Sequence, residues 1–546
     1  MHILLDGGPL MRACVFFCVL LLGGCGGSPE DLLIDKKFSF ALSQAEFRCE
    51  AMVGGGCADI TIAATPLSGY SDARPSWTER ADTAGASVVS RIDSHKLADG
   101  KWQLRIVLKN HLPVGSYAGV LEFTPFVLFP LFEEYRPASL SYQVTVSSPP
   151  TQRPALRALP GAGDWQGSAG NPAHTGAVAV TLDAGRFSLR GVHALPGKGE
   201  LSTMVAANRM LYLRQTERPD TPGQIIYRSR LLALDEQDGS LKWSYAHPDA
   251  TRPMTAPAVQ GARLMVLADG DKLISFDAVS GAKQHEALQP STGRTPFFEE
   301  LAPTLVGGAA YLGRDNDLVS ADSVTAVPRW ARSFGESVFR RRAGWAAAVN
   351  QQMVLAPSFG ALRAYGVDDG RELFSVGLPG FSMSGVAVLN EAPVLVDDRS
   401  ALVLNYRGAP GQDMDNILSL VNLETRSLAW SLPGKFVTHP VVGNGVLYVG
   451  NRASQQLEAR RLNDGSLLWA WPLADVQETG FRGGLILTNN LLFVAGERKA
   501  YAIDLGTHKP VWSFHLSGTL ALSANGLLHI LNQDSGARWL STINLH

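Results

Sequence analysis

The chain repeats one short pattern, Asp-x-x-x-Gly-x-x-x-Trp, and this repeat limits its possible folds more than any other feature. A clear copy runs from Asp235 to Trp243, and another ends in Asp464-Gly465-Ser466-Leu467-Leu468-Trp469. A period of about 40 to 45 residues with four short strands per unit is typical of a β-propeller. One unit cannot bury its own apolar face, so units must pack side by side. Aligned on the last column, the copies end at Trp243, His285, Trp330, Phe374, Trp430, Trp469 and Trp512.

One copy shows how the repeat forms a blade. Phe436–Val442 has the pattern of an inner strand, and the Asn-Gly pair that follows tolerates the positive φ values of a tight turn. The next strands are expected at Val446–Val449, Leu457–Leu462 and Ser466–Trp471. We expect the Trp of the last column to pack against the next blade, where truncating it costs about 3–5 kcal/mol. Copies with His285 or Phe374 should dock more weakly. The predicted docking residues are Trp243, Trp330, Trp430, Trp469 and Trp512.

The strand-turn-strand core occurs once more than the complete pattern. An extra unit opens at Leu201–Leu213, and the final unit, Ala521–Asn544, ends before its outer strand. A segment from about Ala177 to Val192 can supply that strand and close the ring without a large unpaired edge. The fold class predicted is therefore all-β, with an eight-bladed β-propeller over residues 163–546.

The start of this region resembles a known superfamily. Asp164-Trp165-Gln166-Gly167 and Gly170–Gly176, together with the repeats, resemble the pyrroloquinoline-quinone-binding-like (quinoprotein-like) β-propellers. That superfamily includes quinone-dependent alcohol dehydrogenases and also non-catalytic envelope lipoproteins. The dehydrogenases carry adjacent cysteines beside the quinone, whereas this chain has no Cys after Cys57. Because these residues are missing, we predict no cofactor, no metal ligand and no catalytic residue, and we predict that the protein is not an enzyme.

The N-terminal sequence is typical of a lipoprotein signal peptide. Ala13–Leu22 is an apolar core too short to span a bilayer, and Leu22-Gly23-Gly24-Cys25 resembles a lipobox. We expect a signal peptide over 1–24, lipid on Cys25 and a tether over 25–35. A buried apolar strand is the alternative. Gly26 replaces the Asp that retains such proteins in the inner membrane, so the predicted location is the outer membrane, facing the periplasm.

Residues 36–148 read as a separate immunoglobulin-like β-sandwich, since short strands recur at the spacing of such folds. Cys49 and Cys57 are the pair that remains for an oxidising compartment, and we expect a disulfide between them. A metal site is the alternative, but no further ligands stand nearby. Residues 149–162, which include Pro149, Pro150 and Pro154, form the predicted linker.

Residues that could carry chemistry have structural explanations. Asp269–Asp271 and Asp315–Asp317 could bind calcium, yet they lack the EF-hand pattern and read as hairpin tips. His174 and His439 have no matching nucleophile and are expected to be structural. Four aspartates at the first repeat column are expected to accept turn hydrogen bonds. They are Asp235, Asp277, Asp322 and Asp504.

Three surface segments remain as candidates for partner binding. Residues 404–416 lie in the longest interval between repeats, and unusual loops on repeat folds often bind partners. Phe339–Arg342 is basic and is either a solvated tip or a site for anionic headgroups or an acidic partner. Phe126–Phe132 is either core or an exposed apolar patch. The net charge of −2 gives no support for nucleic-acid binding. We predict a monomeric scaffold that binds envelope proteins, contacts the membrane through its lipid alone and acts in outer-membrane protein assembly. The alternatives are a quinone-dependent oxidoreductase and an envelope polysaccharide-binding protein.

Overall fold

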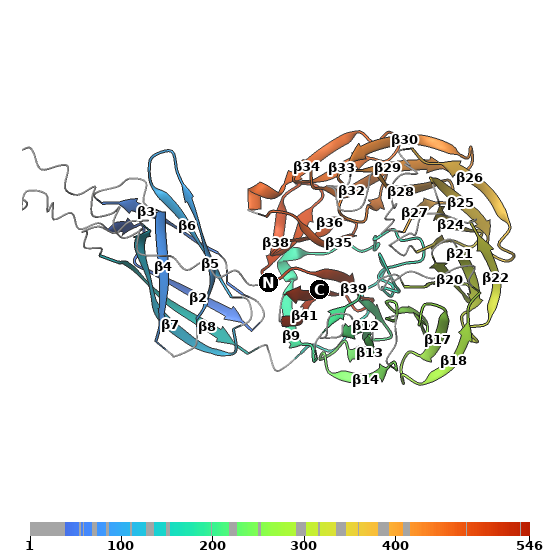
Figure 1. The fold of residues 1–546 in the computed structure, drawn as a ribbon, viewed down its shortest axis with the longest axis horizontal. Helices are drawn as coiled ribbons and strands as arrows, with labels where there is room; N and C mark the ends of the chain where they lie inside the picture. The colour runs from blue at the N-terminus through green and yellow to red at the C-terminus, as the bar shows by residue number, and fades with distance from the viewer. Residues whose placement is uncertain are drawn as a thin grey trace, which may run out of the picture. The chain divides into compact units, whose positions relative to one another are not determined.

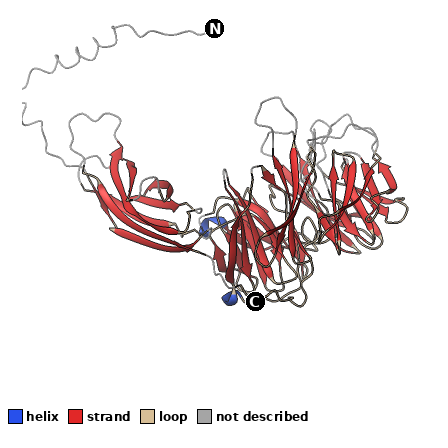
Figure 2. Ribbon diagram, turned by 90° about the horizontal axis from the view of Figure 1, so that it is seen from below, coloured by secondary structure: helices blue, strands red, loops and turns tan. Residues whose placement is uncertain are grey.

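The computed structural model describes residues 39–546 with short gaps. The gaps are 54–55, 58, 68–73, 83–86, 110–111, 127–135, 149–152, 198, 218–226, 249–252, 291–301, 315–316, 335–345, 359, 380–391, 408–414, 477 and 535–536. The chain divides near Val146 into two compact units. Apart from two short 3₁₀ helices, η3 (Ala184–Arg186) and η4 (Leu473–Val476), the described elements are strands (Figure 2). Within these residues, no helix is long and apolar enough to cross a membrane.

The first unit contains two four-stranded antiparallel sheets. Strand β8 (Ala138–Ser147) alternates strictly between buried and exposed residues, which gives its sheet one apolar and one polar face. Ile62, Leu104, Phe123 and Leu140 are among the side chains buried in this unit. Cys49 and Cys57 are disulfide-bonded. The sheets are β1 (Phe40–Leu42), β3 (Ile60–Pro66), β6 (Trp102–Leu108) and β5 (Val89–Lys96), and β2 (Glu46–Met52), β8 (Ala138–Ser147), β7 (Gly115–Phe126) and β4 (Arg74–Ala81).

Over the described residues, the second unit consists of eight antiparallel sheets set around a common centre, as a β-propeller requires (Figure 1). The first contains β10 (Glu200–Leu201), β11 (Val205–Ala207), β12 (Met210–Glu217), β13 (Arg228–Asp235) and β14 (Leu241–Ala246). The next three are β15 (Ala258–Gln260), β16 (Arg263–Ala268), β17 (Lys272–Asp277), β18 (Lys283–Leu288); β19 (Thr304–Val306), β20 (Ala309–Arg314), β21 (Asp317–Asp322), β22 (Pro328–Ser333); and β23 (Ala348–Val349), β24 (Met353–Ser358), β25 (Ala361–Gly366), β26 (Glu372–Gly377). Then follow β27 (Val394–Asp397), β28 (Ser400–Arg407), β29 (Asp415–Asn422), β30 (Ser427–Gly434); β31 (Val441–Gly443), β32 (Val446–Asn451), β33 (Gln456–Arg461), β34 (Leu467–Pro472); and β35 (Phe481–Leu487), β36 (Leu491–Gly496), β37 (Ala500–Asp504), β38 (Pro510–Phe514). The last comprises β39 (Thr519–Leu522), β40 (Leu527–Asp534), β41 (Ala537–Asn544) and β9 (Ser188–Ala194).

Burial falls from the middle strands of each sheet to the outer one. Every residue of β36 is buried, whereas the outer strand β18 is almost wholly exposed. Middle strands lie between two neighbouring sheets, so both of their faces must be apolar, while the outer edge faces water. This explains the continuous apolar runs in the sequence.

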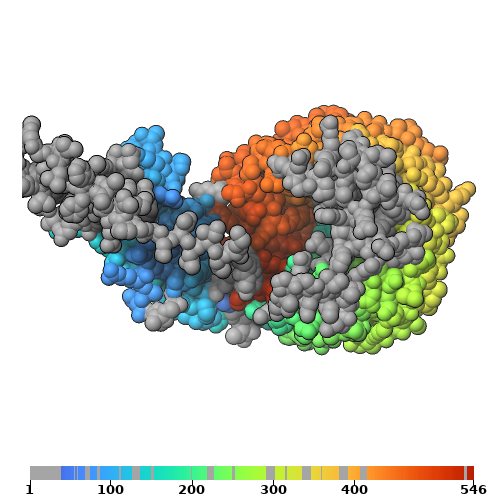
Figure 3. Space-filling view, viewed as in Figure 1, coloured from blue at the N-terminus to red at the C-terminus, as the bar shows by residue number. Residues whose placement is uncertain are grey.

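The last sheet takes its outer strand from the N-terminal flank. Strand β9 pairs antiparallel with β41, from Ser188 opposite Asn544 to Ala194 opposite Trp539. The first and last parts of the unit therefore lie side by side (Figure 3). This closure was predicted and is confirmed, but the strand begins at Ser188 and not near Ala177. The earlier residues lie against other sheets instead.

The repeated pattern joins each sheet to the next. The indole nitrogen of Trp243 donates to the carbonyl of Ala278 in the following sheet, at 3.0 Å. Its ring packs against Gly281, where a Cβ atom would come within 2.5 Å of the ring and where φ is +72°. Glycine is favoured at position 281 by the close approach and by the left-handed backbone. Two further copies repeat the arrangement: Trp330 with Val367 and Gly370, and Trp430 with Leu462 and Gly465.

Where the glycine is absent, another left-handed residue still contacts the flat side chain. His508 stacks on Trp469 with the ring centroids 4.4 Å apart, and the Arg426 guanidinium lies 5.5 Å from the centre of the Phe374 ring. On the last sheet the position belongs to His193 of β9, whose ring lies against Gly239. Sequence analysis missed His193 because no preceding Asp-Gly turn marks it.

Candidate functional site

The centre of the ring is occupied by one chain segment, Trp165–Val178, which we call the hub. The hub and the inner strands exchange main-chain hydrogen bonds in chain order, so the hub fixes the positions of the sheets it contacts. It also satisfies inner-edge groups that would otherwise be unpaired. Carbonyls of Gln166, Pro172, Ala173, Thr175 and Gly176 accept from the amides of Val259, Val349, Leu395, Val442 and Leu487.

The hub folds into a tight turn because of its glycines. Gln166 donates to the Gly170 carbonyl at 2.8 Å, and Gly170 has a φ of +87°. A Cβ atom there would lie 2.7 Å from the Trp165 ring, and one at Gly176 would lie 2.3 Å from Val441. The motif that carries the superfamily resemblance therefore has a mechanical role.

His174 and His439 anchor the hub. His174 Nε2 lies 3.1 Å from the Ala347 carbonyl and 3.4 Å from the Thr304 hydroxyl. Burial, together with the neighbouring His439, lowers the pKa of His174 to about 3, so its ring is neutral. His439 Nε2 donates to the His174 carbonyl at 2.8 Å. These contacts agree with the structural role predicted for both residues.

A cavity of about 310 Å³ lies above the hub, and we call it the central cup. Its floor includes Trp165 and Gly167 from the hub, and its wall includes Thr438, Arg482 and Thr519 near the starts of inner strands. Pockets that hold small molecules typically have volumes of about 300–1,000 Å³. The cup is therefore the candidate site for a ligand.

The cup does not fit the metal-quinone group that the superfamily implies. In its described part, the lining contains no Asp or Glu, whereas a calcium ion needs several oxygen ligands, usually carboxylates among them. Among the residues that the structure describes, no group of three or more His, Cys, Asp and Glu side chains is placed to hold a metal ion. We derive no chemistry through such a group.

The aspartates of the repeat lie in separate turns. Asp277 accepts from the amide of Ser280 at 2.8 Å, and this hydrogen bond lowers the pKa of Asp277. Asp235, Asp322 and Asp504 likewise accept amides one turn ahead. Asp269 pairs with His247 and Lys272 at a hairpin tip. The structure brings none of these carboxylates together into one site.

Several sequence candidates lie outside the described residues. They are Cys25 with the signal and tether, Phe339–Arg342, residues 127–132 of the apolar stretch, Asp315 and residues 408–414. The two ends of the 404–416 segment are described and are strand and not loop: residues 404–407 end β28, and residues 415–416 begin β29. Strand β28 runs antiparallel to β27, so the chain leaves β28 at the end of the sheet where β27 begins. This face of the ring, where the inner strands begin, is called the cup face.

A buried polar network at the ring closure escaped the sequence analysis. Glu236 Oε1 lies 3.2 Å from His529 Nε2, and Asn525 donates to Glu236 Oε2 at 2.6 Å. His529 Nδ1 in turn contacts the Thr542 hydroxyl at 3.1 Å. Burial raises the pKa of Glu236, but the hydrogen bond and charge of His529, together with hydrogen bonds from Ser523 and Asn525, outweigh it, and the net shift is downward. The network joins the first sheet to the last, and no local pattern could reveal it.

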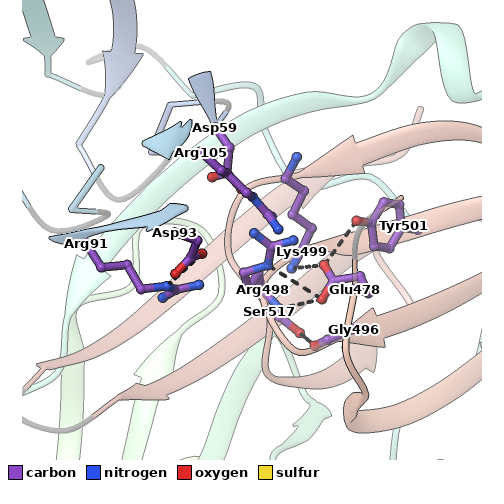
Figure 4. Close-up of polar contacts among 10 residues, drawn as sticks. All are labelled: Asp59, Arg91, Asp93, Arg105, Glu478, Gly496, Arg498, Lys499, Tyr501 and Ser517. Atoms are coloured by element: carbon purple, nitrogen blue, oxygen red, sulfur yellow. Dashed lines mark hydrogen bonds and ion pairs between the residues drawn. The ribbon is translucent and has the colours of Figure 1, made fainter. Parts of the chain in front are cut away.

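A second buried carboxylate holds one hairpin on the cup face (Figure 4). Glu478 accepts from the amides of Arg498 and Lys499, both at 3.1 Å, and from the Tyr501 hydroxyl at 3.0 Å. Its side chain is fully buried, and this desolvation raises the pKa of Glu478. A Cβ atom on Gly496 would lie 2.7 Å from the Glu478 carboxyl carbon. These contacts define a structural clamp on the β36–β37 turn.

Fold and site together define a quinoprotein-like β-propeller with a ring of docked repeats around a hub. The chain belongs to the family described as outer membrane protein assembly factor BamB, whose family model matches residues 193–356 and 228–471. This agrees with the resemblance seen in the sequence.

Three similar proteins show the range of relatives. Tetrathionate hydrolase of Acidithiobacillus ferrooxidans is 22% identical over 360 residues, which cover 62% of this chain and 61% of that protein. A europium-containing methanol dehydrogenase structure has a TM-score of 0.51 at 11% identity, covering 70% of this chain and 98% of its own. BamB from Moraxella catarrhalis has a TM-score of 0.46 at 13% identity, covering 66% and 99%.

These relatives correct one prediction. The sequence analysis excluded an enzyme because the adjacent cysteines of quinone dehydrogenases are missing. That absence bears on one class of dehydrogenase alone. A sequence relative of this chain is a hydrolase, and a methanol dehydrogenase shares its fold. The prediction that the protein is not an enzyme is therefore wrong, because the missing cysteines do not exclude the other activities found among similar proteins.

Proposed function

We propose that this protein is an envelope lipoprotein that docks protein partners and acts in outer-membrane protein assembly. In this proposal the eight sheets are eight blades of one ring, and the first unit is an immunoglobulin-like sandwich. Lipid on Cys25 is the membrane anchor, on the periplasmic side of the outer membrane. The observation that carries the proposal is the match to the assembly-factor family over about half of the chain.

The geometry of the ring supports a docking role. The hub bonds to the inner strands, and flat side chains such as Trp243 and Trp330 join neighbouring sheets. Because the sheets are bonded to the hub at the centre and to each other farther out, the ring is rigid. Its loops therefore lose little conformational entropy when a partner binds, which favours affinity. The candidate segment 404–416 joins β28 to β29 on the cup face, so we assign partner binding to this face.

Site-specific crosslinking tests this assignment. A photoreactive residue is placed at Asp415, the exposed first residue of β29 on the cup face. The control position is Gln351, an exposed turn residue on the opposite face. We expect a defined envelope protein, identified by mass spectrometry, to crosslink at Asp415 and not at Gln351. Equal crosslinking at both positions, or none at either in intact cells, would contradict the docking proposal.

A second candidate function is catalysis in the central cup. It is favoured by the identity to tetrathionate hydrolase, although the match spans 61% of that protein, and by a cavity large enough for a small substrate. Purified protein should be assayed for tetrathionate hydrolysis and for dye-linked alcohol oxidation. Turnover that is lost when the cup is filled by Gly484→Leu would place the activity there.

A further inference from the structure

We propose that the central cup is a binding site for a small organic anion with one carboxylate and an apolar body, bound without a metal ion. This ligand site goes beyond the docking function and does not depend on it. The argument rests on space that the chain leaves open, on main-chain groups beside that space, and on the charge of the lining.

Two glycines lie beside open space in the cup, although their backbone conformation does not require glycine. A Cβ atom on Gly167 in the floor or on Gly484 in the wall would meet no atom within 4 Å, and neither residue is left-handed. Gly483 is different, because its Cβ would lie 2.3 Å from the Gly518 carbonyl. Packing therefore explains Gly483, whereas Gly167 and Gly484 keep the backbone accessible to a ligand.

The wall of the cup also contains an irregular strand segment. The register of β35 jumps from Phe481 opposite Gly496 to Leu485 opposite Val494, so residues 482–484 together face Ala495. Such a bulge leaves some main-chain groups outside the ladder and re-aims side chains. Here the bulge borders the cup, so its polar main-chain groups lie beside the open space left at Gly484.

The charge of the lining selects an anion. Arg482 is the one Lys, Arg, Asp or Glu among the described lining residues, and its exposed side chain donates a 3.2 Å hydrogen bond to the Gln533 carbonyl. His174 is neutral because burial lowers its pKa to about 3. With no acidic side chain in the described lining, an anion meets attraction and no repulsion, and a divalent cation finds no carboxylate ligand.

The remaining lining sets the size and shape of the ligand. Trp165, Phe481, Met204 and Leu520 offer apolar and aromatic contacts around a volume of about 310 Å³. That volume is near the lower end of the range for small-molecule sites, about 300–1,000 Å³. A compact molecule with one carboxylate and one apolar group fits these features, and phenylacetate is a suitable probe.

Isothermal titration of the full chain tests the proposal with phenylacetate and with its neutral twin, phenylacetamide. We expect saturable binding of phenylacetate, with phenylacetamide about tenfold weaker because the charge-assisted hydrogen bond is lost. Arg482→Gln should weaken phenylacetate by about tenfold and leave phenylacetamide unchanged, since the substitution keeps a donor but removes the charge.

A matched pair of glycine variants separates a filled cup from a damaged fold. Gly484→Leu should abolish phenylacetate binding. Gly377→Leu is the control, because Gly377 lies exposed on the outer strand β26 and an added Cβ there also meets no atom within 4 Å. Both variants should keep the wild-type circular dichroism spectrum and unfolding midpoint.

The proposal is overturned by any of three results. The first is no saturable binding of phenylacetate, benzoate or octanoate to the wild type. The second is equal loss in Gly484→Leu and Gly377→Leu. The third is a site that takes pyrroloquinoline quinone with calcium, or tetrathionate, in preference to the carboxylates. None of these results alters the crosslinking test of the docking role, so the two proposals fail separately.

Discussion

Truncating one of the aromatic side chains that join neighbouring sheets should lower the free energy of unfolding by an amount that can be estimated from its burial. Trp330 is 8% exposed, and its indole nitrogen donates to the Val367 carbonyl at 3.1 Å. Trp330→Ala should therefore lower the free energy of unfolding of the second unit by about 3–5 kcal/mol, the usual cost of truncating a buried Trp. Trp330→Phe keeps most of the buried ring and loses the hydrogen bond, so it should cost about 1 kcal/mol for that bond, with a smaller packing term.

His285 provides the matched control, since it occupies the same repeat column but is exposed. His285→Ala should change stability by less than about 0.5 kcal/mol, as substitutions at the surface usually do. Urea unfolding followed by circular dichroism measures all three variants, and the comparison holds where the slope of the transition is unchanged. Equal losses for Trp330→Ala and His285→Ala would refute the docking role that we assign to this column.

Four further predictions concern two buried carboxylates, one backbone position and the lipid anchor. Glu236 has a pKa below its usual value of 4.5, so its contribution is present above that pH and is lost as the pH falls; Glu236→Gln should flatten the acid side of an unfolding-midpoint profile, and an unchanged profile would exclude the closure network. Glu478 has a raised pKa and should act in the opposite direction, so Glu478→Gln should gain stability relative to wild type as the pH rises; a parallel shift at all pH values would contradict this. Gly281→Val should destabilise strongly, because φ is +72° and a Cβ would lie 2.5 Å from Trp243; a thermal midpoint equal to wild type would show that the contact yields. Cys25→Ser should abolish palmitate labelling and release the protein from membranes, and persistent labelling would disprove the lipobox assignment.

The sequence determined the propeller because its signals are local and repeated. Each Asp at the first column accepts an amide a few residues ahead, and left-handed residues four positions later, such as Gly281 and His508, contact the ring of the preceding sheet. These contacts recur with the repeat, so the pattern remains visible even where His508 or Arg426 replaces the glycine. The sequence likewise predicted that the last sheet needs an outer strand from the N-terminal flank, because the final unit lacked one.

What the tertiary structure decided depends on pairs far apart in the chain. Ser188–Ala194 is the closing strand because the residues before Ser188, from the hub onward, are already hydrogen-bonded to other sheets. The Glu236–His529 pair joins residues from the first and last sheets, and His193 takes a docking position without the motif that marks the others. The central cup exists only once the ring has closed around the hub. These side chains are not part of the repeated pattern and meet their partners only when the ring closes. The sequence therefore contains no repeated signal that would reveal them.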